Sequence, residues 1–333
     1  MKRLKIISIS LLITGIALFI GHRYFSPGRP AGDGQKKIEY EVQKGKGVQS
    51  IGKELASQGL IRSAEYFRWI LKLTGRSGKL KAGVYELNDG MSAFEVADVL
   101  TEGRVRMLAL TIPEGWNNRQ IGDYFASKGL VKDRQEFLDL ASDPAVLGHY
   151  RIPGKTTEGY LFPDTYMVPL KYPAAKVQDI MIRRFFEVLE ELEIKQTDPA
   201  ELHRRVILAS IVEREAKKEE ERPIMSQVFL NRIEKRMRLE SCATVQYLFD
   251  RPHPRLLEKD LFIESPYNTY RHGGLPPGPI SNPGKAAISA AFHPDSVPYL
   301  FFARKPDGSH HFSVTFKEHL EAKKRFIDPL FAN

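Results

Sequence analysis

An uncharged, apolar run over residues 6–21, preceded by Lys2, Arg3 and Lys5, constrains this chain more than any other feature. As a helix rising about 1.5 Å per residue, the run spans ~24 Å, slightly less than a ~30 Å hydrocarbon core. Lys5 and Arg23 can extend to the headgroups and close this gap. The run therefore predicts one membrane-spanning helix and leaves the rest of the chain to fold in water.

The residues that follow the run decide between an anchor and a cleaved signal peptide. A signal peptide ends in a small-x-small cleavage site, whereas residues 21–25 are GHRYF, so we expect an uncleaved anchor. The positive-inside rule places the N-terminus in the cytoplasm. We therefore expect a single-pass inner-membrane protein whose remaining chain is extracytoplasmic, or periplasmic. Residues 26–37 (SPGRPAGDGQKK) are predicted to form a flexible tether.

The composition is that of a globular protein. Hydrophobic residues make up 42% and charged residues 27% of 333 residues, which excludes wholesale disorder and a polytopic membrane protein. The net charge of +9 suits a nucleic acid, an anionic membrane or an acidic polymer equally well. A single cysteine, Cys242, excludes an intrachain disulfide and a Cys-based zinc site, and we expect no cofactor.

Two segments of the first half match at a constant offset. Residues 51–60 are IGKELASQGL and residues 121–130 are IGDYFASKGL, and further matches flank both. Each copy predicts a short strand, a glycine turn and a helix that ends at a Gly-Leu pair. Between the copies, 83–87 predicts a strand, and Ser92 predicts the N-cap of a helix over 92–100. The first copy with this strand and helix loosely resembles a LysM-type glycan-binding module. A packing module without glycan contact is the alternative.

A helix with well-defined start residues carries the catalytic candidate. Asp198 predicts an N-cap, with Pro199 at N1 and Glu201 at N3. At 100° per residue, Glu215 falls on the same face as the apolar residues of this helix, whereas Glu213 is rotated about 200° away from Glu215. Apolar surroundings favour the protonated form of a carboxyl group and suit a general acid. The alternative is that Glu215 is the first solvated residue of the charged run 217–222.

Six strings of residues occur in the order that one family shows. They cover about 150–330 and are EGYLFPDTY (158–166), ASIVERE (209–215), SQVFLNR (226–232), YNTY (267–270), GLPPGPI (274–280) and AFHPDSVPYLF (291–301). By these strings the chain resembles the YceG-like endolytic murein transglycosylases (the MltG type). The resemblance implies a lytic transglycosylase (lyase) that cuts the bond between N-acetylmuramic acid and N-acetylglucosamine in peptidoglycan strands. The anchor and the short tether make nascent strands the nearest substrate. The products would carry 1,6-anhydro ends, and strand length would be limited.

The resemblance also implies site residues. The second glutamate of ASIVERE, Glu215, would be catalytic. The familiar form of a later motif is Asp-Pro-Thr-Val, whereas this chain has Cys-Ala-Thr-Val from Cys242 onward, so it must do without that aspartate. The implied partners are glycan strands, the inner membrane and peptidoglycan polymerases, with no nucleic acid. Candidate substrate-binding residues are Tyr267, Asn268, Tyr270, Thr244 and Glu158. Tyr267, Asn268 and Tyr270 could instead serve only to pack their loop. For Glu158 we favour a structural role, in which its carboxylate pins a loop.

We therefore predict an α+β protein. Its parts are a cytoplasmic tip and anchor (1–25), the tether (26–37), a LysM-like module (38–106), a partial repeat (107–150) and a mainly helical catalytic domain (151–330) with strands near 299–303 and 311–315. His310 and His311 would point to opposite faces of a strand, so we expect no metal site there. The rival hypotheses are a noncatalytic peptidoglycan-binding scaffold and, less favoured, a nucleic-acid-binding protein.

Overall fold

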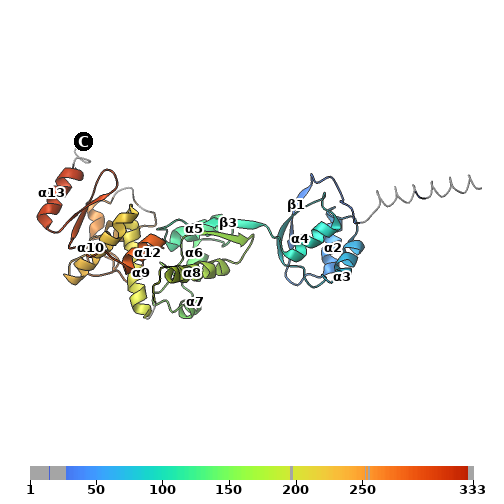
Figure 1. The fold of residues 1–333 in the computed structure, drawn as a ribbon, viewed down its shortest axis with the longest axis horizontal. Helices are drawn as coiled ribbons and strands as arrows, with labels where there is room; N and C mark the ends of the chain where they lie inside the picture. The colour runs from blue at the N-terminus through green and yellow to red at the C-terminus, as the bar shows by residue number, and fades with distance from the viewer. Residues whose placement is uncertain (1–14, 16–27, 196–197, 252, 254–255, 329–333) are drawn as a thin grey trace, which may run out of the picture. The chain divides into compact units, whose positions relative to one another are not determined.

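The computed structural model describes residues 15, 28–195, 198–251, 253 and 256–328 (Figure 1). The predicted anchor lies outside these residues, apart from Gly15. Within the described ranges, none of the helices combines the length and the apolar character that a bilayer span requires. The described residues form helices and three two-stranded sheets, as expected for an α+β protein.

The chain forms two compact units. Unit 1 consists of Met1–Leu108 and Met167–Lys171, and unit 2 of Ala109–Tyr166 and Tyr172–Asn333. The chain passes between them in β3 (Met107–Thr111) and β4 (Thr165–Pro169), which form one of the two-stranded sheets.

Unit 1 packs three helices against a two-stranded antiparallel sheet. In β1 (Lys37–Val42) and β2 (Gly83–Asn88), Tyr40 lies opposite Tyr85, and both are buried. The apolar faces of α2 (Val48–Ser57), α3 (Ala64–Leu73) and α4 (Ala93–Glu102) complete one hydrophobic core. The N-cap of α4 is Ser92, in a capping box with Glu95, which confirms the predicted start of this helix.

The predicted repeat has a structural counterpart in α5 (Asn118–Ser127) and α6 (Arg134–Ala141) of unit 2. Each copy is a helix pair that follows a strand. Gly59 and Gly129, at equivalent positions, have φ of 72° and 69° and terminate the first helix of each pair. The equivalent Phe67 and Phe137 are both fully buried. The repeated sequence thus encodes the same helix–turn–helix packing twice.

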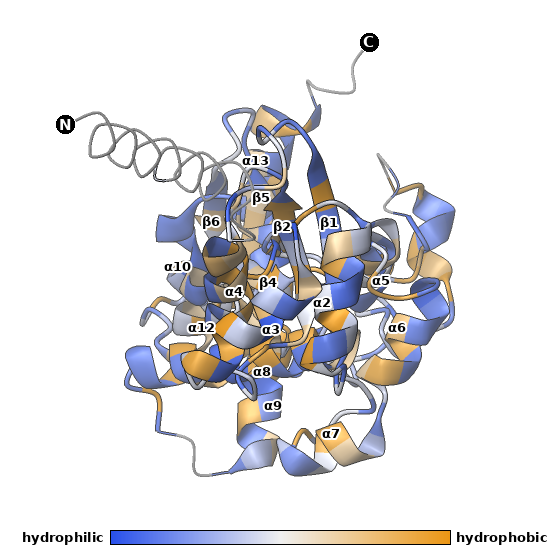
Figure 2. Cartoon of the chain, turned by 90° about the vertical axis from the view of Figure 1, so that its right-hand side faces the viewer, coloured by the Kyte–Doolittle hydropathy of each residue, from blue (hydrophilic) through white to orange (hydrophobic). Residues whose placement is uncertain are grey.

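Unit 2 is built around α9 (Pro199–Glu215), which packs against α10 (Arg222–Glu234), α11 (Cys242–Gln246) and α12 (Lys285–Phe292). Asp198 caps α9 by accepting hydrogen bonds from two backbone N–H groups, as predicted. Figure 2 shows that the helices carry both hydrophobic and hydrophilic residues. The remaining helices of unit 2 are α7 (Pro144–His149), α8 (Ala174–Glu191), η1 (Glu219–Glu221), η2 (Glu258–Phe262) and α13 (Phe316–Phe326).

The two strands predicted near the C-terminus are confirmed, with bounds shifted by one to two residues. They are β5 (Phe301–Arg304) and β6 (His310–Ser313), which pair antiparallel. His310 is buried, and its Nδ1 lies 2.7 Å from Oε2 of Glu221, whereas His311 is exposed. The two rings therefore do point to opposite faces.

Candidate active site

The carboxylate of Glu215 is held at the C-terminal end of α9. Its Oε1 accepts a hydrogen bond from the Ser241 hydroxyl at 2.5 Å and another from the N–H of Ala243 at 3.2 Å. These donors lie at the start of α11, and Ser241 uses its hydroxyl for Glu215 instead of capping its own helix. The carboxylate is thus fixed by two donors from a distant segment of the chain, a contact that helical periodicity cannot predict.

A buried threonine pair supports the Ser241 segment. Thr244 donates a hydrogen bond to the backbone oxygen of Ser241 at 2.7 Å, and its hydroxyl lies 2.9 Å from that of Thr269. The Thr269 hydroxyl also accepts a hydrogen bond from the Ser241 N–H at 3.0 Å. Thr244 and Thr269 are fully buried or nearly so. This network fixes the backbone from which Ser241 reaches Glu215.

Glu215 opens into a cavity of about 500 Å³. The lining combines acidic, basic and aromatic groups. Burial raises the pKa of the Tyr270 phenol above its ordinary value, with smaller contributions from Cys242 and Glu215, so this phenol stays protonated at neutral pH. The residues that line the cavity are Glu215, Arg232, Leu239, Glu240, Cys242, Tyr270, Phe302, Phe316, His319, Lys323 and Ile327.

Arg232 organises one wall of this cavity, a role that the sequence does not predict. Its side chain is 6% exposed and donates hydrogen bonds to the backbone oxygens of Leu300, Arg238 and Leu239 at 2.7–3.0 Å. It also reaches Glu240 at 3.2 Å. Arg232 is the last residue of the SQVFLNR string, which is the one sign of its importance in the sequence. The string does not reveal the backbone oxygens and the Glu240 carboxylate that Arg232 binds.

Glu213 has different partners from Glu215, as its rotation around α9 predicts, but the side of α9 on which it lies is buried as well. Its side chain is 6% exposed, pairs with Arg222 at 3.0 Å and accepts a hydrogen bond from the N–H of Gly284. Burial raises the pKa of Glu213, while Arg222 opposes that shift. The reason is that residues 206–212 are all buried, so α9 has no solvent-facing side there. Rotation around this helix therefore cannot separate a buried from an exposed glutamate.

The candidate binding residues fall into different places. Tyr270 lines the Glu215 cavity, and its hydroxyl lies 3.1 Å from Sγ of Cys242. Cys242, which stands where the familiar motif has aspartate, thus also lines the cavity. Asn268 is fully buried and donates to the backbone oxygens of Leu261 and Ile263, so its amide holds the loop.

Tyr267 and Glu158 line a second cavity, of about 430 Å³, which Glu215 does not line. The buried Glu158 carboxylate accepts hydrogen bonds from the N–H of Asn118 and from the side chains of Tyr247 and Asn282. Burial raises its pKa to about 8, although the Asn118 and Tyr247 bonds oppose the shift. Glu158 thus pins loops together, which is the role favoured from the sequence.

Among the described residues, no group of three or more histidine, cysteine or acidic side chains is arranged to hold a metal ion. The Glu215 cavity offers one carboxyl group held by hydrogen bonds, a second carboxyl group at Glu240, and the phenol of Tyr270. A fixed carboxyl group in a cavity lined by aromatic side chains is suited to general acid–base chemistry on a sugar.

Comparisons with known proteins show the family to which this chain belongs. An "Endolytic murein transglycosylase" of Bacillus subtilis (strain 168) is 33% identical over 95% of this chain and 91% of its own length. A protein of the same name from Streptococcus pneumoniae is 29% identical over 80% of this chain and 54% of its own length. A crystal structure of a yceG-like protein from Listeria monocytogenes matches with a TM-score of 0.55 and 30% identity, over 86% of this chain and 99% of that one. Residues 40–325 match the YceG-like family, and the chain belongs to that family.

Proposed function

We propose that this protein is an endolytic murein transglycosylase, a lyase that cuts peptidoglycan strands, with Glu215 as its single acid–base group. The observation that carries the proposal is the Glu215 carboxylate, held by Ser241 and Ala243 at the edge of a sugar-sized cavity. The names of the Bacillus and Streptococcus relatives support the same activity.

In the proposed reaction, the protonated Glu215 donates its proton to the oxygen between N-acetylmuramic acid and N-acetylglucosamine, and the bond from C1 to that oxygen breaks. The Glu215 carboxylate then takes the proton of the C6 hydroxyl of the same muramic residue. O6 bonds to C1 and gives a 1,6-anhydro end, so no water is consumed. The internal nucleophile gains from proximity, because it is already part of the bound sugar.

The two oxygens of Glu215 have different roles in this proposal. Ser241 and Ala243 both donate to Oε1 of Glu215, and no described residue donates a hydrogen bond to Oε2. We assign the transferred proton to Oε2, because Oε1 is already engaged by two donors. Of the predicted binding residues, Tyr270 shares the cavity with Glu215, and we assign it to contact the sugar next to the reacting bond.

The location and the accessory module complete the proposal. The apolar run 6–21 supports a single anchor in the inner membrane, with the residues after Tyr24 outside the cytoplasm. The β1–α2–α3–β2 order supports a LysM-like module in unit 1. A membrane-held enzyme would meet newly made strands first, which favours peptidoglycan polymerases as partners and strand-length control as the role.

Digestion of purified peptidoglycan, followed by mass spectrometry and sizing of the products, tests the activity. Internal cuts with 1,6-anhydro ends are expected from the wild type and not from Glu215→Gln. Reducing muramic ends would indicate hydrolysis, and release of terminal disaccharides alone would contradict endolytic cutting. Protease protection in cells tests the topology. Full digestion of unit 1 and unit 2 from the cytoplasmic side would contradict it.

A further inference from the structure

One surface of unit 1 exposes large apolar side chains. Tyr66, Trp69 and Leu73 follow one another on one side of α3, and Phe94 of α4 adjoins them. The exposed fractions are 54% for Trp69, 64% for Leu73 and 47% for Phe94. The Tyr66 ring lies 6.0 Å from that of Trp69 and 6.2 Å from that of Phe94, so the three rings form one strip. We call these four residues the aromatic face.

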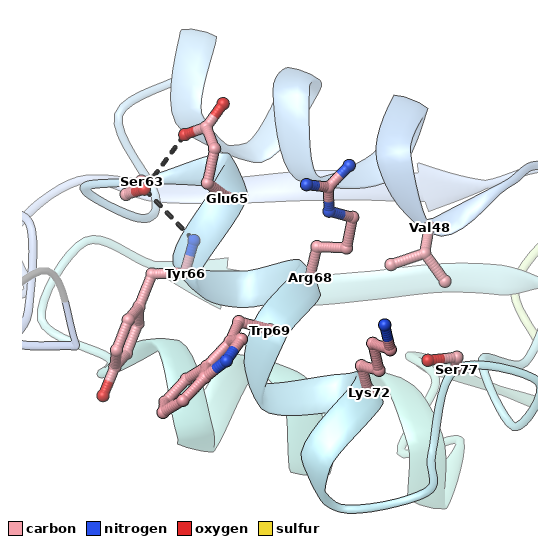
Figure 3. A pocket seen from close by; sticks show the side chains of 8 residues that line it. All are labelled: Val48, Ser63, Glu65, Tyr66, Arg68, Trp69, Lys72 and Ser77. Carbon is pink, nitrogen blue, oxygen red and sulfur yellow. Dashed lines mark hydrogen bonds between the residues drawn. The ribbon is translucent and has the colours of Figure 1, made fainter.

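The aromatic face borders the core of unit 1, against which Tyr66 packs while Trp69, Leu73 and Phe94 stay exposed. The core side of α3 consists of Phe67, Ile70 and Leu71, which are at most 2% exposed. Figure 3 shows the rings of Tyr66 and Trp69 projecting to the same side of α3. Contiguous exposed apolar surface of this kind usually marks an interaction site.

Basic groups accompany the aromatic face. Arg68 and Lys72 line, with Tyr66 and Trp69, an open hollow of about 940 Å³ (Figure 3). The acidic residue there, Glu65, accepts a hydrogen bond from Ser63. Aromatic rings together with lysine and arginine are the side chains that favour the interface of an anionic membrane.

The path of the chain places this face close to the predicted anchor. The backbone of Gly28 lies against Tyr66, since a Cβ at Gly28 would be 2.7 Å from Cε1 of that ring. The Gly28 oxygen accepts a hydrogen bond from the N–H of Ala93 at 3.3 Å, and Arg62 donates one to the Pro30 oxygen at 2.8 Å. Residues 28–36 of the predicted tether are therefore bound to unit 1 at several points.

This attachment limits the distance between the face and the bilayer. Gly28 follows Gly21, the last residue of the apolar run, by seven positions, which span at most ~25 Å when fully extended. A tether that was flexible over all of 26–37 would have allowed a larger distance between the aromatic face and the bilayer. The apolar run therefore keeps Tyr66 and its neighbours within reach of the headgroups.

We propose that the aromatic face inserts into the headgroup region of the membrane that carries the anchor. The proposal rests on the membrane attachment described under the proposed function. Leu73 and Phe94 offer no hydrogen-bonding group to a sugar, which favours a lipid surface over a glycan. Unit 1 is then held at two points, by the anchor and by α3, and this fixes its orientation on the membrane.

The two tryptophans of the chain, Trp69 and Trp116, provide an internal probe and its control. The full-length protein is reconstituted into vesicles of phosphatidylcholine and phosphatidylglycerol that contain brominated lipids. Trp116→Phe leaves only Trp69, and Trp69→Phe leaves only Trp116. Because interfacial residues insert ~5–10 Å deep, we expect roughly twofold quenching of Trp69 and little of Trp116. Replacing Arg68 and Lys72 by alanine should reduce the quenching of Trp69 in these anionic vesicles.

Three results would overturn the proposal, each in a distinct way. If the protein does not float with the vesicles, the membrane attachment fails and this inference with it. If it floats but Trp69 is not quenched, the inference alone fails. If Trp69 is not quenched by lipid but its emission shifts with soluble N-acetylglucosamine oligomers, the face is a glycan platform instead. The Leu73→Ser variant should weaken quenching, whereas Phe262→Ser, at an exposed apolar residue of unit 2, should not.

Discussion

The Ser241 hydroxyl lies 2.5 Å from Oε1 of Glu215 and donates a hydrogen bond to it, although Glu215 ends α9 and Ser241 is the N-cap residue of α11. The N–H of Ala243 joins the same oxygen at 3.2 Å. The side chain of Glu215 therefore has one fixed direction, which is the condition for repeated proton transfer to and from a bound sugar. We assign Ser241 the role of a positioning residue.

Removal of the Ser241 hydroxyl should lower kcat more than it changes KM. A hydrogen bond to a charged group contributes roughly 1.5–3 kcal/mol, so Ser241→Ala should reduce kcat about 10- to 100-fold. Ser241→Thr, which keeps the hydroxyl, should restore most of the loss. Steady-state kinetics on purified glycan strands measure both constants.

Ser226 of α10 is the matched control for this experiment. It is fully buried, and its hydroxyl has no hydrogen-bond partner among the described residues. Ser226→Ala should leave kcat near that of the wild type. Equal losses of kcat in Ser241→Ala and Ser226→Ala would indicate that Ser241 contributes only to packing.

Glu215→Gln should abolish strand cleavage without unfolding the protein. The amide keeps the size of the side chain but cannot donate or accept the transferred proton, and general acid–base catalysis contributes about 10²–10⁴-fold. Glu240→Gln tests the other carboxyl group of the cavity and should have a far smaller effect, because Glu240 pairs with Arg232. Anhydro ends counted by mass spectrometry give the readout. A comparable loss in Glu240→Gln would indicate a two-carboxylate reaction instead.

Replacement of Glu213 should destabilise the protein. Its carboxylate forms a buried ion pair with Arg222, and removal of one partner leaves the other charge buried and unpaired. We expect Glu213→Ala to lower the free energy of unfolding by about 3–5 kcal/mol, measured by denaturant titration. The control is Glu219→Ala, at an exposed residue of η1, which should change it little. An unchanged unfolding midpoint for Glu213→Ala would contradict the structural role.

Glu158 should make stability depend on pH. Burial raises its pKa from 4.5 to about 8 in the folded state, so the folded protein binds this proton more tightly than the unfolded chain does. This contribution is complete below about pH 4.5 and is lost as the pH rises through about 8, with a slope of at most about 1.4 kcal/mol per pH unit. Denaturant unfolding of wild type and Glu158→Gln across this range measures the difference. A difference that does not vary with pH would rule out this titration.

Alkylation of Cys242 should block the enzyme. Cys242 is the only cysteine of the chain, is exposed, and lines the cavity of Glu215. A maleimide adduct would fill space that the glycan strand needs, so activity should fall in proportion to labelling. The Cys242→Ser variant should remain active under the same treatment. Full activity of the labelled wild type would place the substrate elsewhere.

Much of the local structure could be predicted because it depends on neighbouring residues. The Asp198–Pro199 pair defined the start of α9, Ser92 defined that of α4, and the repeated IGxxxAS pattern predicted matching helices. Capping, helix termination at glycine and burial of an apolar face all operate within a few residues. The family followed from six ordered strings, and the family match over residues 40–325 confirms it. The choice of Glu215 followed from one of these strings and from the apolar face of α9.

The tertiary structure decided what depends on contacts between distant residues. Periodicity placed Glu213 away from the core, but α9 is surrounded by other helices, so its burial is set by neighbours that the helix itself does not encode. The donors to Glu215 come from another helix, and the backbone partners of Arg232 include Leu300, far along the chain. The sequence by itself determined which helices form and which glutamate to examine. Only the packing of those helices determined which side chains hold that glutamate, because hydrogen bonds and burial depend on distances in space.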